Sequence, residues 1–217
     1  MRSRLVVTED LAGEAVRQFL QAAPRTIALS GGSTPRPAYE ALARSGYDWD
    51  GVHAFMVDER CVPMSHPDSN FRMASEALLA RVPAVVHPMN GAACEPDAYE
   101  ADLRAHFGEG GVPRIDLCFM GIGDDGHTAS LFPGRPELDV MDRWVVRVDE
   151  PGMEPLYPRL TLTVPVLSAA RLALFLVSGA SKRGPVGRLL GGDPDLPACR
   201  IRAEEVVLVA TPDAVPA

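Results

Sequence analysis

A histidine in a glycine-rich turn is the residue of this chain best placed for chemistry. The turn Gly121-Ile122-Gly123-Asp124-Asp125-Gly126-His127 follows the apolar run 115–120, which is typical of a buried strand. In open α/β sheets, ligands bind beyond the carboxyl ends of the strands. An imidazole changes its protonation state near neutral pH, so His127 is a candidate general base. Asp125 is a candidate to orient either the ring or the loop, and the spacing does not decide between these two roles.

The same turn matches the spacing of a dinucleotide-binding fingerprint, with glycines at 121, 123 and 126. That fingerprint needs a long helix that opens at its third glycine, whereas Pro133-Gly134 arrives within two helical turns. Two adjacent aspartates would also repel a pyrophosphate. We therefore disfavour nucleotide binding.

A second glycine-rich turn follows the strand predicted at 26–29. Its sequence is Ser30-Gly31-Gly32-Ser33-Thr34-Pro35. The glycines let the backbone approach a ligand, the hydroxyls can cap a helix or donate, and Pro35 suits the first helical position. A strand, a glycine turn and a helix N-terminus together form an anion site. A capped turn without a ligand is the alternative, because capping uses the same residues.

Charged residues follow two other predicted strands. Asp58-Glu59-Arg60 follows the strand 53–57, where it forms either part of a site or a surface ion pair. Lys182 follows the longest apolar run, 172–177, at the predicted start of a helix. A lysine is unfavourable at that end of a helix dipole, which indicates that an anion stands opposite.

The remaining histidines are expected to have structural roles or to lie on the surface. His87 is expected to be structural, and His53, His66 and His106 are expected to lie on the surface, His106 near the end of a helix. The sequence offers no His/Cys/Asp cluster with ligand spacing. We therefore predict no metal and no cofactor.

The elements that must position these residues follow from apolar patterns and stop signals. Thr8 is the predicted cap of the first helix, and Ser69 or Asn70 the predicted cap of a later one. The predicted strands are 5–7, 26–29, 53–57, 85–87, 115–120, 144–148, 160–164, 172–177 and 206–209, and the main helices lie near 9–23, 35–42, 70–82 and 95–107.

Length and composition indicate one globular domain, residues 1–217, without a linker. The net charge of -8 argues against nucleic acid or an anionic membrane as the main partner. No stretch is apolar enough to cross a bilayer, and the N-terminus is too short in its apolar part for a signal peptide. The four cysteines are scattered, which predicts a reduced, cytoplasmic chain. We expect a monomer or a weak homo-oligomer.

Taken together, these loops resemble the 6-phosphogluconolactonase family from about Thr26 to Lys182. The resemblance is carried by Ser30–Pro35, Val57–Pro63, Asp68-Ser69-Asn70, Gly121–Pro133 and Arg159–Thr163, in that order. The family shares a superfamily with glucosamine-6-phosphate deaminase, ribose-5-phosphate isomerase and CoA-transferase-like folds. The resemblance implies an α/β fold with a doubly wound, mostly parallel sheet and helices on both faces.

It also implies an activity, the hydrolysis of 6-phospho-D-glucono-1,5-lactone to 6-phosphogluconate in the oxidative pentose phosphate pathway. His127 would activate water, Asp58 would position water or sugar hydroxyls, and N–H groups of the histidine loop would stabilise the oxyanion. The phosphate would lie at the second glycine turn with Arg60 and Lys182, and Arg159 is a weaker candidate. The expected substrate-binding residues are Gly31, Gly32, Ser33, Thr34, Arg60, Asn70, Gly123, Arg159 and Lys182.

Two other functions stay open. Deaminases of the superfamily continue after the histidine with phenylalanine, asparagine, glutamate and proline, and the glutamate helps to open the sugar ring. Here the segment is Thr128-Ala129-Ser130, without a carboxylate, which disfavours a deaminase or isomerase. A non-catalytic sugar-phosphate sensor would keep the phosphate turn without needing His127. The chain also departs from the family pattern at Asp124, where glutamate is usual, and at Val209-Ala210-Thr211-Pro212, which lacks the tryptophan and aspartate usual near the family's C-terminus.

Overall fold

A seven-stranded parallel sheet forms the centre of the computed structural model, which describes residues 2–216. Its strand order is β1-β10-β9-β6-β2-β3-β5, and every neighbouring pair is parallel. The strands are β1 (Arg2–Val7), β2 (Thr26–Leu29), β3 (His53–Met56), β5 (Val85–Val86), β6 (Leu117–Met120), β9 (Leu172–Val177) and β10 (Glu205–Ala210). All residues of β6 and β9 are buried, as continuous apolar runs in a sheet covered on both faces require.

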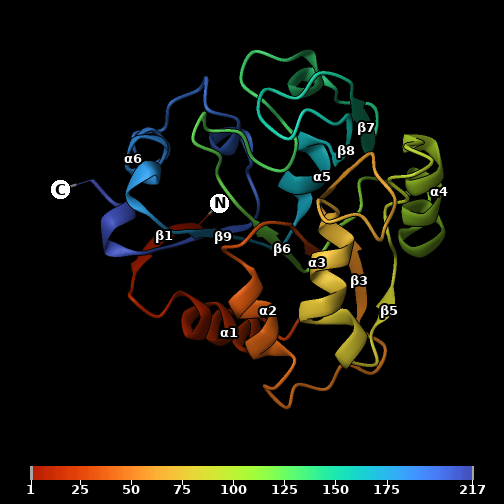
Figure 1. Cartoon of the computed structure of the whole chain (residues 1–217), viewed down its shortest axis with the longest axis horizontal. Helices are drawn as coiled ribbons and strands as arrows, with labels where there is room; N and C mark the ends of the chain where they lie inside the picture. Colours follow the sequence, from red (N-terminus) through yellow and green to blue (C-terminus); the bar gives the residue numbers. More distant parts are fainter. Residues whose placement is uncertain (1, 217) are drawn as a thin grey trace.

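Helices cover both faces of this sheet, with α1 and α2 on one side and α5 and α6 on the other (Figure 1). The helices are α1 (Leu11–Ala22), α2 (Arg36–Leu42), α3 (Asn70–Ala77), α4 (Pro96–Phe107), α5 (Val164–Ala169) and α6 (Arg183–Leu190). The apolar stripe of α1 places Phe19 in the core, where its ring stacks on Trp49. The doubly wound, mostly parallel architecture expected from the sequence is therefore confirmed.

A separate antiparallel sheet stands beside the main one and was not expected. It consists of β4 (Asp58–Arg60), β8 (Arg159–Leu162) and β7 (Val145–Val148), with β8 in the middle. Asp58 pairs with Thr161 and Arg60 pairs with Arg159, so two candidate site cations lie directly opposite each other. The chain thus leaves the main sheet after β3 and carries its charged residues into the second sheet.

Two predicted details of the helix starts are wrong. Asp10 caps α1 by accepting a hydrogen bond from the N–H of Gly13, and Thr8 instead accepts one from the N–H of Asp10. Pro35 precedes the first residue of α2, and neither Ser33 nor Thr34 caps that helix. Ser69 caps α3, which confirms one of the two residues predicted to cap that helix.

Two of the features that the sequence disfavours, a dinucleotide-binding fingerprint and a membrane span, would each require a long helix. The residues after β6 form turns up to the short 3₁₀ segment Pro136–Asp139, so the long helix of a dinucleotide fingerprint does not open at Gly126. Within residues 2–216, no helix is long and apolar enough to span a bilayer.

Candidate active site

A cavity of about 210 Å³ opens at the carboxyl ends of β2, β6 and β9, against the second sheet. Its walls bring together residues that lie far apart in the sequence. Of the predicted site residues, the lining includes Gly31, Gly32, Thr34, Asp58, Arg60, Asn70, Gly123, His127, Arg159 and Lys182. Asp125 lies behind His127, and Ser33 lies outside this cavity, on a neighbouring surface hollow.

The loop after β6 is held by its own hydrogen bonds. The N–H of Gly123 donates to the carbonyl of His127 at 2.8 Å, and the N–H of Gly126 donates to the carbonyl of Gly123. Thr128 closes the loop from the other side, since its hydroxyl donates to the carbonyl of Gly121. A ring carried by such a loop keeps one position, as general base catalysis requires.

Asp125 orients both the ring and the backbone of His127. One carboxylate oxygen, Oδ1, lies 2.6 Å from Nδ1 of the ring and accepts a hydrogen bond from the backbone N–H at 3.0 Å. Burial acts to raise the pKa of Asp125, but the hydrogen bonds from His127 outweigh it and hold that pKa below its usual value. An ionised carboxylate cannot donate, so in the neutral form of the imidazole the ring proton sits on Nδ1 and Nε2 keeps a free lone pair.

Gly123 is required where the His127 ring approaches the backbone. A Cβ at this position would lie 2.0 Å from Nδ1 of the ring and 2.6 Å from Oδ1 of Asp125. Both groups would have to move, so the imidazole would lose its place in the cavity.

We expect Gly123→Ala to lower kcat about 10²-fold, the cost of a displacement near 1 Å in a catalytic group. Steady-state kinetics would measure this loss. Gly110→Ala is the matched control, because a Cβ there meets nothing within 4 Å. A Gly123→Ala enzyme with the rate of the wild type would show that the ring position is not critical.

Asp58 forms part of the cavity wall and is itself held on both oxygens. Oδ2 accepts a hydrogen bond from the Ser130 hydroxyl at 2.6 Å, and Oδ1 accepts one from the Asn70 amide at 3.1 Å. Asp58 is 5% exposed. The buried Ser130 was not predicted as a site residue, since only the fold brings it to the end of β3.

Glu59, between Asp58 and Arg60, has a structural role rather than a surface ion pair. Its Oε1 accepts from the N–H groups of Arg60 and Asn70, and its Oε2 accepts from the Ser69 hydroxyl and the N–H of Phe71. Burial raises the pKa of Glu59, and the hydrogen bonds oppose this rise. The carboxylate therefore joins β4 to the start of α3, where the helix dipole favours an anion.

Three cations line the cavity. Arg60 donates to the carbonyl of Asp68, and Arg159, 2% exposed, donates to the carbonyls of Met153 and Pro155. The anion expected opposite Lys182 is Asp124, whose carboxylate lies 2.6 Å from Nζ. The hydrogen bond from Lys182 lowers the pKa of Asp124.

Several polar atoms of the cavity residues lack a partner within the chain. Among residues 2–216, the buried atoms without a hydrogen-bond partner include Nε of Arg60, Nε of Arg159 and Oδ1 of Asn70. Buried polar groups are nearly always satisfied, so unpaired ones at a cavity point to a bound polar molecule. The two arginines suit an anionic one.

The second glycine turn lines the cavity with Ser30, Gly31, Gly32, Thr34 and Pro35. A Cβ at Gly31 would lie 1.7 Å from Oδ1 of Asn70, so glycine is required for this contact. Gly32 has a φ of +100° and is also favoured as glycine. Thr34 lines the cavity, whereas Ser33 is exposed beside it.

Four N–H groups of the histidine loop are not free to stabilise an oxyanion. Those of Gly123, Gly126, His127 and Thr128 already donate to oxygens within the loop. The sequence-based assignment of the oxyanion to this loop is therefore wrong for these four donors, because the loop uses them to hold its own shape.

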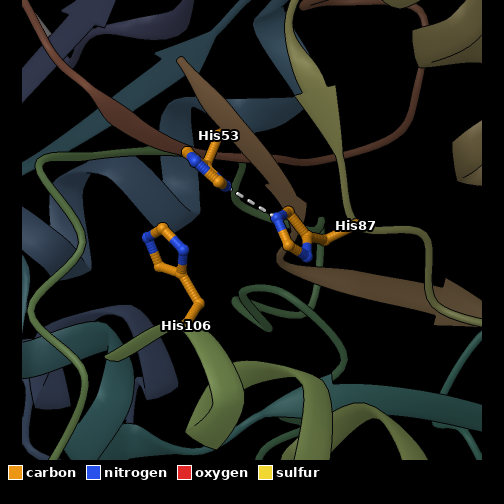
Figure 2. A group of neighbouring side chains, drawn as sticks. All are labelled: His53, His87 and His106. Atoms are coloured by element: carbon orange, nitrogen blue, oxygen red, sulfur yellow. Dashed lines mark hydrogen bonds between the residues drawn. The ribbon is translucent and has the colours of Figure 1, made fainter. Parts of the chain in front are cut away.

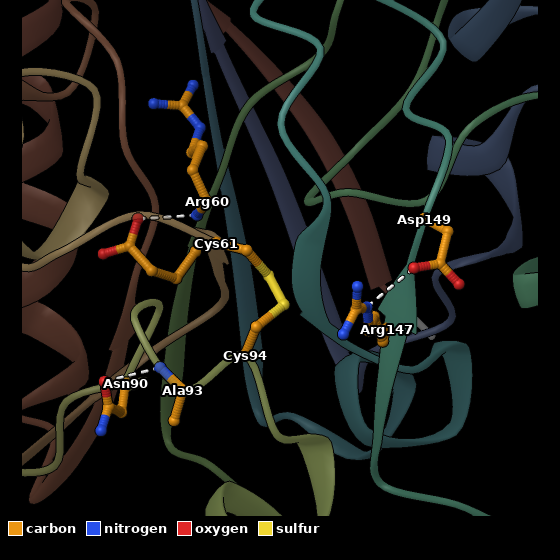
Figure 3. Close-up of a disulfide and its surroundings, with 8 residues drawn as sticks. Arg60, Cys61, Asn90, Ala93, Cys94, Arg147 and Asp149 are labelled. Atoms are coloured by element: carbon orange, nitrogen blue, oxygen red, sulfur yellow. Dashed lines mark hydrogen bonds and ion pairs between the residues drawn. A yellow bond between two sulfur atoms is a disulfide. The ribbon is translucent and has the colours of Figure 1, made fainter.

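A disulfide joins Cys61 to Cys94 next to the cavity (Figure 3). Their Cα atoms lie 5.2 Å apart, within the usual range for such bonds, although 33 positions separate them in the sequence. The prediction of four reduced cysteines is thus wrong for this pair, and it holds for Cys118 and Cys199. The bond fastens the residue after Arg60 to the segment that precedes α4.

Known proteins resemble this chain over nearly its full length. A family model described as glucosamine-6-phosphate isomerases/6-phosphogluconolactonase matches residues 5–209. A 6-phosphogluconolactonase from Synechocystis is 47% identical over 179 residues, which cover 78% of this chain and 73% of the relative.

Solved structures agree with this match. The crystal structure of 6-phosphogluconolactonase from Thermotoga maritima superposes with a TM-score of 0.84 at 30% identity, covering 97% of this chain and 99% of the other. A monomeric glucosamine-6-phosphate deaminase shares the fold, with a TM-score of 0.80 at 22% identity over 99% of this chain and 98% of its own. The match of the family model over residues 5–209 and the 47% identity to the relative from Synechocystis both lead to one conclusion: the chain belongs to the glucosamine-6-phosphate isomerase/6-phosphogluconolactonase family.

Proposed function

We propose that this protein is a carboxylic ester hydrolase that converts 6-phospho-D-glucono-1,5-lactone to 6-phosphogluconate. One observation carries the proposal: the oriented imidazole of His127 shares a single cavity with Arg60, Arg159 and Lys182. A base for water and a cluster of cations for a phosphate are what a phosphorylated lactone needs. The names of the relatives point to the same reaction.

His127 is the proposed general base. Its Nε2 takes a proton from water while the water oxygen attacks the lactone carbonyl carbon. The tetrahedral intermediate then collapses, the bond from this carbon to the ring oxygen breaks, and the imidazolium returns the proton to the leaving oxygen. Asp125 stabilises the imidazolium through the 2.6 Å contact with Nδ1. The acid product loses a proton to solvent, so no covalent intermediate and no cofactor is required.

The other cavity residues are proposed to hold the substrate. The phosphate lies between the backbone of Gly31-Gly32, Thr34 and the cations Arg60 and Lys182. Arg159 and Asn70 supply the polar atoms left unpaired within the chain. Asp58 accepts hydrogen bonds from sugar hydroxyls or from the attacking water. Ser33 is retained only as a contact at the rim.

Hydrolysis of freshly prepared lactone, corrected for spontaneous opening at controlled pH, is the test. The proposal predicts turnover well above the spontaneous rate. Ammonia release from glucosamine-6-phosphate would instead support a deaminase, and binding of sugar phosphates without turnover would support a sensor. The sequence disfavours the deaminase, because the segment after His127, Thr128-Ala129-Ser130, contains no carboxylate.

Arg60→Ala is expected to raise KM about 10–100-fold with a smaller effect on kcat, since a hydrogen bond to a charged group contributes about 1.5–3 kcal/mol. Initial rates over a range of lactone concentrations would measure both constants. Arg72→Ala is the control, because Arg72 pairs with Glu76 on the exposed side of α3. An unchanged KM in Arg60→Ala would place the phosphate elsewhere.

We also propose a cytoplasmic location and a monomer or weak homo-oligomer. The single domain of residues 1–217 likewise stays a prediction. Light scattering over a range of concentrations would measure the oligomeric state, and fractionation of the source cells would test the location.

A further inference from the structure

Three histidines outside the cavity gather at one edge of the main sheet. His53 begins β3, His87 follows β5, and His106 lies in the last turn of α4. One ring nitrogen of each lies within 4.8 Å of those of the other two. Figure 2 shows the three rings converging from three different elements on one common space. The cluster could not be recognised in the sequence, because its members are separated by 34 and 19 positions.

A hydrogen-bonded chain fixes two of these rings. Nδ1 of His87 lies 2.9 Å from Oδ2 of Asp102, and Nε2 of His87 lies 2.9 Å from Nδ1 of His53. In the tautomer that donates its Nδ1–H to Asp102, His87 presents the lone pair of Nε2 to the cluster. A carboxylate that orients an imidazole in this way is the usual support of a metal-binding histidine.

The surroundings hold the cluster in place. The Phe55 ring stacks on His87, with centroids 4.2 Å apart and an interplanar angle of 13°. All three side chains are only half-buried, so an ion can reach them from solvent.

We propose that His53, His87 and His106 form a binding site for Zn²⁺, separate from the catalytic cavity. Zinc accepts three imidazole nitrogens and a water molecule in tetrahedral geometry. Two nitrogens bound to one zinc ion stand roughly 3.4 Å apart, given Zn–N distances of about 2.0–2.1 Å. The 2.9 Å between Nδ1 of His53 and Nε2 of His87 therefore has to lengthen by a few tenths of an ångström, and the proton on Nδ1 of His53 moves through solvent to Nε2 of the same ring, which stays neutral.

An ion at this position would join β3, the segment after the edge strand β5 and the end of α4. β5 has two residues and a single strand neighbour, so this edge of the sheet has few bonds of its own. The site is thus expected to stabilise the fold rather than to take part in hydrolysis.

Titration of the chelator-treated protein with zinc chloride, followed by calorimetry and by thermal unfolding, tests the proposal. We expect one equivalent to bind and to raise Tm, because the ion binds the folded state. X-ray absorption at the zinc edge should show nitrogen and oxygen ligands without sulfur, which excludes binding at Cys199.

Matched variants separate the site from other ligands. Asp102→Asn should weaken zinc binding about 10–100-fold, as loss of a supporting hydrogen bond does, and His106→Gln should weaken it more. His66→Gln, outside the cluster, should bind as the wild type does. Circular dichroism and retained lactone hydrolysis would show that the variants are folded.

Two outcomes would overturn the proposal. One is a wild-type protein that neither binds zinc nor gains thermal stability at millimolar zinc chloride. The other is a folded His106→Gln variant with undiminished affinity, which would place the ion on other residues.

Discussion

Alanine at position 127 is expected to lower kcat for lactone hydrolysis by ~10²–10⁴-fold, the usual range for the loss of a general base. The His127 ring is the group in the cavity whose Nε2 is freed by a carboxylate bound to the other nitrogen. KM should change little, because the proposed phosphate contacts involve other residues. Steady-state kinetics with correction for spontaneous opening measures both constants.

His66→Ala serves as the control, since this half-buried imidazole does not line the cavity. His127→Ala should also keep the Tm of the wild type to within a few degrees, because the loop is held by backbone hydrogen bonds. A variant that hydrolyses the lactone at the wild-type rate would refute the assignment of the base and leave the family membership intact.

Glu59→Gln is expected to destabilise the folded state by about 2–5 kcal/mol. The two carboxylate oxygens accept four hydrogen bonds, whereas a glutamine can accept with only one end. Its NH₂ group would face either two backbone N–H groups or one N–H and the Ser69 hydroxyl. Each buried donor left unpaired costs about 1–3 kcal/mol. Urea denaturation, read as the shift in midpoint at constant m, measures the loss.

The matched control is Glu150→Gln, because the Glu150 side chain is 82% exposed and its ion pair with Arg135 contributes little. Activity should fall with stability in Glu59→Gln, since Asp58 and Arg60 flank the position and Asn70 binds it directly. Equal urea midpoints for the two variants would show that Glu59 does not hold β4 to α3.

The central sheet could be predicted because burial on both faces leaves a visible pattern. β2, β6 and β9 are short apolar runs that end in glycine turns, and the structure places each close to its predicted bounds. The cavity residues could be predicted for a related reason. The carboxyl ends of parallel strands meet at one edge, so polar residues after these strands had to come together.

The second sheet could not be predicted in this way. β4 consists of Asp58, Glu59 and Arg60, a composition that does not favour a strand. Its pairing depends on β8, which lies about a hundred positions later, and on the α3 N-terminus that satisfies Glu59. The pattern of residues along a short segment carries no information on partners that lie far away in the sequence. For the same reason, neither the disulfide nor the histidine cluster could be predicted.

The histidines illustrate the limit most clearly. Each of the three in the cluster was given a structural or surface role, and taken singly each position supports that interpretation. The start of β3, the end of β5 and the last turn of α4 become neighbours only when the sheet and α4 are assembled.

The bond between Cys61 and Cys94 has a practical consequence for anyone who handles this protein. A thiol reductant in a purification buffer would release the cross-link beside Arg60, whereas an aerobic preparation would retain it. The two samples would differ by one disulfide cross-link. Stabilities and Michaelis constants measured on them would therefore belong to two distinct molecular species. Thiol titration of every batch would make such values comparable between laboratories.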